Sequence, residues 1–423
     1  MKKIIFILLS LLGLITTDFS VSFAAGFAIN VHGAKPSGMS EAFAARADDP
    51  STIFYNPAGI NQLKGTNLSL ETTVILPNVE FNSDIGNNSE QDRQAFFPST
   101  LYITHQIDNR FSAGLGIFSP FGLGTKWPKD WEGRFMLTLS EIKTIFINPA
   151  LSWQITPDLS VAGGFDYVFT DVRIERQINM ELYGGAPSSE GDISLKGNDT
   201  GSGYNLGLLY RIDPDLNVGL TYRSPVKLEV NDGDADFTVP AGFESTFSDS
   251  KIKTDITLPP TIILGMIFSS MLKDLALEFD LTWTGWSKID RLAVEFLDNN
   301  LPTDITELNW DDVFSYRFGG EYRWSESILL RGGYAFEKSP MPEDKYTPAI
   351  LPDGDRHIIS FGGGYDHNNG FGIDLFYQII LIKGDKNNNV GSELKSTNVA
   401  DARANGEYKT TVNLAGIGVK YHF

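Results

Sequence analysis

The sequence contains no cysteine, little positive charge and no long apolar run after its first twenty residues. The lack of cysteine excludes a disulfide framework and a thiolate metal site. The chain has 34 basic residues against 53 acidic ones and a net charge of −19. This balance argues against nucleic-acid binding, which requires a basic face. No second run of about 18 apolar residues is present, so no transmembrane helix is expected.

Aromatic residues and glycine are abundant instead. Aromatic side chains make up 12% of the chain, and 41 of its 423 residues are glycine. This composition argues against a mainly disordered chain. Length alone favours two or three soluble domains. Many aromatic residues without an apolar block, however, call for a more specific explanation.

The N-terminus has the features of an export signal. Two lysines precede an apolar stretch over residues 4–15, and small residues follow at positions 22 and 24. The stretch is too short to span a membrane, so we predict a secretory signal peptide over residues 1–24. Cleavage one residue later, after Ala25, is an alternative, and a retained membrane anchor is another.

Apolar and polar residues alternate along most of the chain after residue 66. One example is the series Leu275, Leu277, Phe279, Leu281 and Trp283, which alternates with Ala276, Glu278, Asp280 and Thr282. A period of two indicates β-strands. Several runs reach ten residues, whereas strands in soluble proteins average about five or six. Tilted strands of about 9–11 residues cross a bilayer, so the runs favour membrane strands over a soluble sandwich.

The pattern predicts fourteen strands, and outer-membrane barrels of bacteria have an even number. The expected strands are 67–81, 98–107, 111–118, 142–155, 159–179, 203–212, 216–230, 252–268, 274–296, 314–324, 328–337, 357–366, 371–383 and 407–423. Tight turns alternate with long polar connections, as periplasmic turns alternate with external loops. The last strand ends in Phe423, a common feature of the closing strand in such barrels. We therefore predict an all-β fold, a transmembrane antiparallel β-barrel over residues 67–423 with long extracellular loops.

Residues 25–66 do not alternate and are rich in small side chains. We expect a short helix around 40–47 and a turn at 56–59. A barrel of fourteen strands is too wide for its own side chains to fill. We therefore predict that residues 25–66 form a hatch, an N-terminal plug with short helices inside the barrel. A loose periplasmic tail is the alternative.

Four segments resemble the FadL/TodX family of outer-membrane transporters for long-chain fatty acids and aromatic hydrocarbons. They are Gly-Phe-Ala-Ile-Asn at 26–30, Ala-Ala-Arg-Ala-Asp-Asp-Pro-Ser-Thr at 44–52, Asn-Pro-Ala-Gly at 56–59 and Phe-Ser-Pro-Phe-Gly at 118–122. The resemblance implies a fourteen-stranded barrel closed by a hatch. It also implies an apolar groove among the outer loops and a tighter pocket inside the barrel.

The resemblance assigns roles to particular residues, which are expectations here. The mature N-terminus would reach into the inner pocket, and the hatch motif would be Asn56, Pro57 and Ala58. A kink in the third strand would open a lateral gap in the barrel wall. The residues assigned to the pocket are Ala25, Gly26 and Phe27, and those assigned to the kink are Gly114, Gly116 and Phe118.

Two further groups are candidates for ligand binding. The connection 119–141 carries more apolar side chains than an external loop normally exposes, so we expect it to form a binding groove, unless it packs on itself. The groove candidates are Phe121, Leu123, Trp127, Trp131 and Phe135. Arg173 could pair with a ligand carboxylate, because a guanidinium fits this group bidentately. It could equally form a salt bridge with Glu175, Glu181 or Asp171.

These observations predict a transporter in the cell outer membrane that takes up hydrophobic small molecules by passive diffusion and releases them sideways into the membrane. Its partners would be the ligand and outer-membrane lipid, and we expect a monomer without metal or cofactor. The five histidines occur in no catalytic motif, so we do not expect an enzyme. A general diffusion porin and a structural or adhesive barrel are the alternatives. The sequence leaves open whether the substrate is a fatty acid or an aromatic hydrocarbon.

Overall fold

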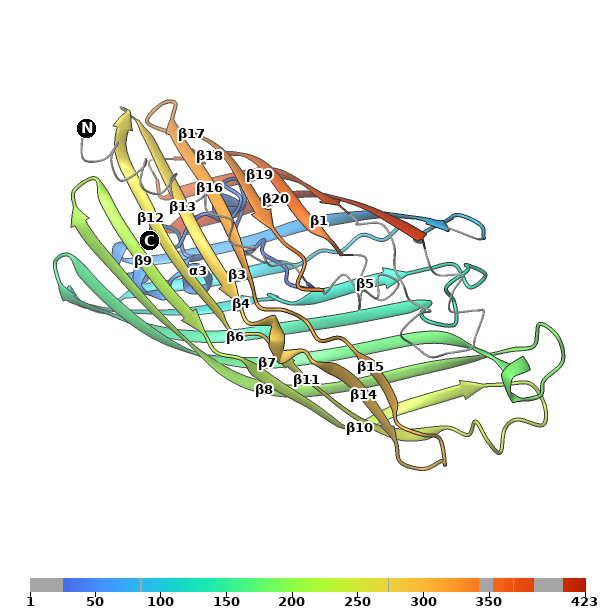
Figure 1. The fold of residues 1–423 in the computed structure, drawn as a ribbon. Helices are drawn as coiled ribbons and strands as arrows, with labels where there is room; N and C mark the ends of the chain where they lie inside the picture. The colour runs from blue at the N-terminus through green and yellow to red at the C-terminus, as the bar shows by residue number, and fades with distance from the viewer. Residues whose placement is uncertain (1–25, 84–85, 273, 342–352, 368, 384–405) are drawn as a thin grey trace.

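The protein is a closed antiparallel β-barrel of fourteen strands (Figure 1). The computed structural model describes residues 26–83, 86–272, 274–341, 353–367, 369–383 and 406–423. The barrel closes because β1 (Thr66–Ser83) pairs with β3 (Ser99–Gln106) on one side and with β20 (Gly406–His422) on the other. The predicted fold class is therefore confirmed. The predicted leader, residues 1–24, and Ala25 lie outside the described residues.

Most barrel strands are continuous, and four are split in two. The other continuous strands are β6 (Leu139–Thr156), β7 (Leu159–Asn179), β8 (Glu190–Asp213), β16 (Val313–Arg323), β17 (Ile328–Glu337), β18 (Asp355–Asp366) and β19 (Phe371–Lys383). The split strands are β4 (Phe111–Phe118) with β5 (Gly122–Lys126), β9 (Leu216–Arg223) with β10 (Val226–Thr238), β11 (Ser250–Leu258) with β12 (Thr261–Leu272), and β13 (Leu275–Thr284) with β14 (Arg291–Phe296). The short strands β2 (Ser89–Glu90) and β15 (Asp304–Glu307) lie in connections.

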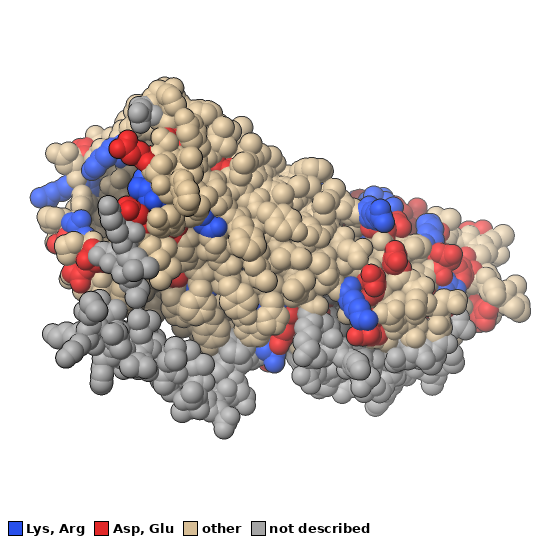
Figure 2. All heavy atoms as spheres, turned by 90° about the horizontal axis from the view of Figure 1, so that it is seen from above, with Lys and Arg blue, Asp and Glu red and all other residues tan. Residues whose placement is uncertain are grey.

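The two faces of the wall differ as the alternation predicts. Leu277, Phe318 and Leu375 are 38%, 50% and 52% exposed on the outer surface. Their chain neighbours Glu278 and Arg317 are buried. Figure 2 shows charged side chains gathered at the two ends of the molecule, with an uncharged band between them. Such a band is what a lipid-facing surface requires.

The splits in the strands follow from proline and from local register. Proline has no backbone N–H, so it removes a ladder hydrogen bond and interrupts a strand. Pro120 lies in the first split, Pro225 in the second, and Pro259 and Pro260 in the third. The last three splits lie side by side, since Thr261 pairs with both Arg223 and Thr284, the ends of β9 and β13. Three neighbouring strands therefore break at one level.

The hatch packs inside the barrel through short helices and turns. These helices are α2 (Ala34–Ser37), α3 (Thr52–Tyr55) and the 3-10 helix η1 (Pro57–Gln62), while the 3-10 helices η2 (Met180–Tyr183) and η3 (Trp286–Lys288) lie outside the hatch. No helix in the described part of the chain has the length and hydropathy that a membrane crossing requires.

Asn56 joins two parts of the hatch to the wall. Its side-chain oxygen accepts a hydrogen bond from the N–H of Ala58 at 3.2 Å and so caps η1. Its side-chain nitrogen donates to the carbonyls of Ala44 at 2.7 Å and Leu208 at 3.0 Å. Pro57 follows at the first position of η1, where its missing N–H costs nothing. The Asn-Pro-Ala segment therefore has a structural role at the contact between hatch and β8.

Glycines in the wall let the hatch backbone approach closely. A Cβ atom on Gly219 would lie 2.0 Å from the carbonyl oxygen of Ala44, and one on Gly333 would lie 2.3 Å from the carbonyl carbon of Met39. Gly265, which pairs with Gly219, would collide with Ala44 at 2.9 Å. These three positions form a glycine seat for the hatch, since any larger residue would displace it.

Two carboxylates of β13 hold the hatch by its backbone. Asp280 accepts hydrogen bonds from the N–H groups of Phe43 at 2.8 Å and Ala44 at 2.9 Å. Glu278 accepts from the N–H groups of Ala45 at 2.7 Å and Arg46 at 3.0 Å. The turn at 43–46 is thus bound firmly to one side of the lumen.

We predict that Asn56→Ala loosens the hatch. The change removes three hydrogen bonds and leaves two buried carbonyls without this donor, which should cost about 2–4 kcal/mol of docking free energy. Ion conductance of the purified protein in planar bilayers should rise. Asn78→Ala, at an exposed position of β1, is the matched control and should conduct like the wild type. Equal conductance of all three proteins would contradict the role given to Asn56.

Candidate ligand-binding site

Four buried aromatic side chains meet inside the barrel and form what we call the aromatic cluster: Phe27, Phe121, Trp286 and Trp310. The Phe27 ring lies 5.1 Å from Trp286, 5.8 Å from Phe121 and 5.9 Å from Trp310. Trp286 and Trp310 are 5.2 Å apart. Most of these contacts are edge-to-face, an arrangement that aromatic rings favour. The N-terminal segment therefore packs against the other three rings of the aromatic cluster through Phe27.

The strand splits bring the members of the cluster together. Phe121 lies between β4 and β5, and Trp286 begins η3 between β13 and β14. Phe27 is held there by backbone pairing, since its carbonyl accepts the N–H of Gly122 at 3.0 Å. The N–H of Ile29 donates to the carbonyl of Pro120 at 2.8 Å. The start of the hatch thus pairs with the wall where the strand is interrupted.

An ion pair binds the backbone of Gly26 through both its N–H and its carbonyl group. The N–H of Gly26 donates to Asp353 at 3.1 Å, and its carbonyl accepts from Arg356 at 2.5 Å. Asp353 and Arg356 are themselves paired at 2.9 Å. Gly26 has φ +65°, and a Cβ atom there would lie 2.6 Å from the ring of Trp286. Both the backbone conformation and the contact require glycine at this position.

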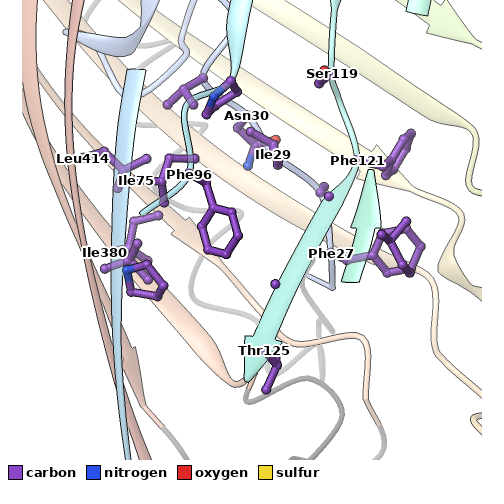
Figure 3. Close-up of a pocket in the computed structure, with 18 of the residues that line it drawn as sticks. Phe27, Ile29, Asn30, Ile75, Phe96, Ser119, Phe121, Thr125, Ile380 and Leu414 are labelled. Atoms are coloured by element: carbon purple, nitrogen blue, oxygen red, sulfur yellow. The ribbon is translucent and has the colours of Figure 1, made fainter. Parts of the chain in front are cut away.

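A cavity of about 430 Å³ lies beside this segment. The first hatch residues, β1, β5, β19 and β20 form its walls, and Figure 3 shows Phe96, Ile75, Ile380 and Leu414 around it. The lining is mostly apolar. A cavity of about 150 Å³ is large enough to hold benzene, so this one has room for a long chain or several rings.

The cavity crosses the barrel wall. Its lining includes Ile380 on the lumen side and also Ile145 and Phe97, which are exposed on the outer surface. The crossing lies beside the split after Phe118, where β4 ends. Lys143 and Glu141 line the cavity as well and pair with each other at 2.7 Å. The lining therefore includes residues from both faces of the wall.

His32 adds an uncharged ring to the interior. Its ring lies 3.8 Å from Phe54 and 5.8 Å from Phe118, centre to centre. Burial lowers the pKa of His32 to about 3, because a charged imidazole would lose its hydration there. Its Nε2 donates to the carbonyl of Ile29 at 2.6 Å. The ring is thus neutral at neutral pH and behaves as part of the apolar interior.

Comparison with known proteins agrees with this geometry. The model of the family described as outer membrane protein transport protein (OMPP1/FadL/TodX) matches residues 15–423. This chain belongs to the FadL/TodX family. It is therefore an outer-membrane transporter of hydrophobic compounds and not an enzyme.

Individual relatives resemble this FadL/TodX-family chain along most of its length. It is 25% identical to the long-chain fatty acid transport protein of Escherichia coli O6:H1, over 84% of this chain and 86% of the relative. A Pseudomonas aeruginosa FadL homologue superimposes with a TM-score of 0.83 at 19% identity, covering 94% of this chain and 100% of that one. The Pseudomonas putida toluene transporter TodX gives 0.73 at 17% identity, with 95% and 100% covered.

The structure brings some of the predicted site residues together. Gly26, Phe27 and Phe121 line the cavity. Leu123 lies in β5, within the same part of the wall. Gly114 and Gly116 lie in the regularly paired part of β4, where they make room for Ile53 of the hatch. The break in pairing starts only after Phe118, since Pro120 interrupts the ladder there.

The remaining predicted residues lie elsewhere. Trp127 and Trp131 stack at 4.3 Å in a separate buried cluster, which also contains Phe81 of β1 and Tyr408 of β20. This packing corresponds to the alternative that the connection packs on itself. Phe135 is half-buried, with the guanidinium of Arg134 4.6 Å from its ring centre. Arg173 is exposed and pairs with Glu175, as the alternative for that residue held.

Several residues of the site have no role in the sequence prediction, among them Trp286, Trp310 and Arg356. Trp286 lies within an expected strand and Arg356 beside one, whereas Trp310 and Phe96 lie in expected polar connections. The one available signal was Gly285 before Trp286, a residue that weakens strands. Nothing in the spacing of Arg356 or Phe96 indicates that they meet the N-terminal segment or β5, because these contacts span most of the chain.

We predict that Gly26→Ala displaces the N-terminal segment from the aromatic cluster. The added methyl group would collide with Trp286 and would strain a backbone at positive φ, a conformation that costs about 1–2 kcal/mol for a residue with a side chain. Acrylamide quenching of tryptophan fluorescence should therefore increase. Gly184→Ala is the control, since Gly184 has φ +88° but no neighbour within 4 Å of a Cβ atom. A similar increase in both variants would mean that the collision has no effect.

Proposed function

We propose that this protein carries long-chain fatty acids or aromatic hydrocarbons across the outer membrane by passive diffusion, with lateral release into the lipid. A ligand would enter among the outer loops, occupy the cavity beside Phe27 and leave through the wall between β1 and β5. The observation that carries this proposal is the apolar cavity that runs from the lumen to the outer surface.

The free energy of the ligand supports this route. Moving apolar surface out of water is favourable by about 25 cal/mol per Å². An apolar ligand would therefore move from water to an apolar cavity and then to lipid. No step along this path requires an energy source.

The hatch makes a straight aqueous path unfavourable. It is bound to the wall by carboxylates of β13, by Asn56 and by the glycine seat, and an ion pair of 3.0 Å joins Arg317 to Glu41 across the same interface. These contacts oppose the porin alternative, since a general diffusion pore needs an open lumen.

The size of the cavity bears on the substrate. At about 430 Å³ it exceeds the volume that a single aromatic ring needs, and an elongated chain would fill it better. Arg356 lines the cavity, and a ligand carboxylate would have to compete there with Asp353, which pairs with Arg356 at 2.9 Å. The resemblance to the Escherichia coli long-chain fatty acid transport protein points the same way. The toluene transporter TodX supports the aromatic alternative.

The organisation of the chain completes the proposal. Residues 1–24 would be removed on export, 25–66 would close the lumen as the hatch, and 67–423 would form the barrel. One copy would suffice for transport, because the cavity and its exit lie within a single chain.

We predict that Gly122→Phe slows uptake. Gly122 lines the cavity, and its nearest neighbour is the flexible end of Ile29, so a phenylalanine there would project into the route. Uptake of radiolabelled oleate should fall about tenfold in cells that depend on this protein, if the obstruction costs about 1.4 kcal/mol. Gly163→Phe, on the lipid face between Leu151 and Leu206, is the matched control. Unchanged uptake by the Gly122 variant, with normal amounts of folded protein, would refute lateral release.

A further inference from the structure

The barrel wall has a gap between β1 and β5. β1 pairs with β3 only from Thr66 to Thr72, and its continuation toward the outer end lies beyond the end of β3. β5 pairs with β6 on its other side. No pairing among the described strands joins β1 to β5. A short segment of the connection after β1, residues 89–98, occupies this gap, and we call it the strap.

The strap is attached to both edges of the gap. Phe96 exchanges two backbone hydrogen bonds with Ile75 of β1, at 2.9 and 3.0 Å. The N–H of Asp92 donates to the carbonyl of Lys126 in β5 at 2.8 Å. The N–H of Gln91 also donates to the carbonyl of Val79 at 3.0 Å, and β2 pairs with the end of β1. The strap therefore lies along β1 and is bonded to β5 at Asp92, so side chains fill most of the space between the strap and β5.

Phe96 is the side chain of the strap that reaches across the gap to β5. Its ring reaches β5, since a Cβ atom on Gly124 would lie 2.0 Å from the ring tip. Figure 3 shows the ring between β1 and β5, beside the cavity that it lines. The next residue, Phe97, is 66% exposed on the outer surface. Phe96 thus separates the lumen side of the cavity from the lipid side.

We infer that Phe96 is a specificity-determining residue, which sets the width of the lateral exit and thereby selects slender ligands over wide ones. This inference rests on the proposed function, since it concerns the exit of the same route. The backbone bonds to Ile75 hold the strap, so the ring can move by rotation about χ1 while the strap stays in place. Gly124 provides the space in which the ring rests.

Ligand shape follows from this arrangement. A flexible alkyl chain has a small cross-section and can pass a ring that turns aside. A rigid cage-like ligand has a larger cross-section. Its passage would require the whole strap to detach from β1 and β5, which would break backbone hydrogen bonds in an apolar setting. Such bonds are costly to leave unmade there. The lateral exit should therefore discriminate between ligands by their width more than by their length.

The test compares uptake of two carboxylates, radiolabelled oleate and adamantane carboxylic acid, in cells that depend on this protein. Phe96→Ala should raise adamantane carboxylic acid uptake several-fold relative to oleate uptake. Arg93→Ala, at an exposed position of the same strap that does not line the cavity, is the matched control and should leave the ratio of the two unchanged. An unchanged ratio in the Phe96 variant, or an equal change in both variants, would overturn the inference.

A second variant tests the seat of the ring. Gly124→Ala should lower uptake of both probes, because the added methyl group drives the ring of Phe96 into the exit. The double variant Phe96→Ala, Gly124→Ala should restore oleate uptake, and failure to restore it in folded protein would count against the inference. Folding of each variant is checked by whether its mobility in gel electrophoresis changes on heating.

Failure of the proposed function has a different signature. In that case oleate uptake would not exceed that of cells lacking the protein, whatever residue stands at position 96. Failure of the inference alone would leave oleate uptake through the protein intact, with a ratio of the two probes that does not depend on Phe96.

Discussion

The need to pair every backbone polar group within the protein governs this fold, because lipid offers no hydrogen-bonding partner. The closed ladder from β1 round to β20 meets that need along most of the wall. Where a strand is split, other groups take over: Phe27 and Ile29 pair with residues 120–122, and the carbonyl of Pro260 accepts the N–H of Gly285 at 2.9 Å. Breaks are thus tolerated only where protein covers them. The candidate ligand site lies at these breaks, where Phe121 and Trp286 are buried in the interior.

Buried ion pairs also stabilise the packing inside the lumen. Arg223 pairs with Asp166 at 2.6 Å, and Arg331 lies between Glu321 at 2.7 Å and Asp374 at 2.5 Å. Buried charges persist when they are paired in this way. Pairs of Arg46 with Glu321 and of Arg317 with Glu41, both at 3.0 Å, join the hatch to the wall, as do the backbone contacts of Asp280 and Glu278. The apolar cavity lies next to β1 and β5, where the lining carries few charged groups. The cavity and the hatch therefore occupy different parts of the lumen.

Much of this could be predicted from the sequence, and the misses have physical reasons. Period-two alternation gave the strands, since one face meets lipid and the other the lumen. The same alternation runs through Pro225 and Pro259 and predicts continuous strands over 216–230 and 252–268, although proline splits both. β8 begins at Glu190, thirteen residues before the expected start at 203, because its outer part pairs with β7 without a strict apolar face. Apolar content alone could not separate a binding groove from the packed pair Trp127 and Trp131, since that depends on contacts with β1 and β20.

The glycine seat also bears on how the molecule is assembled. Its members belong to β9, β12 and β17, strands that come together only when most of the wall has formed. The hatch precedes all of them in the chain, yet it has no complete surface to dock on until they are side by side. The first segment to leave the translocation machinery must therefore wait, unpacked, and be among the last to reach its native position. Chaperones of the periplasm would meet it in that waiting state.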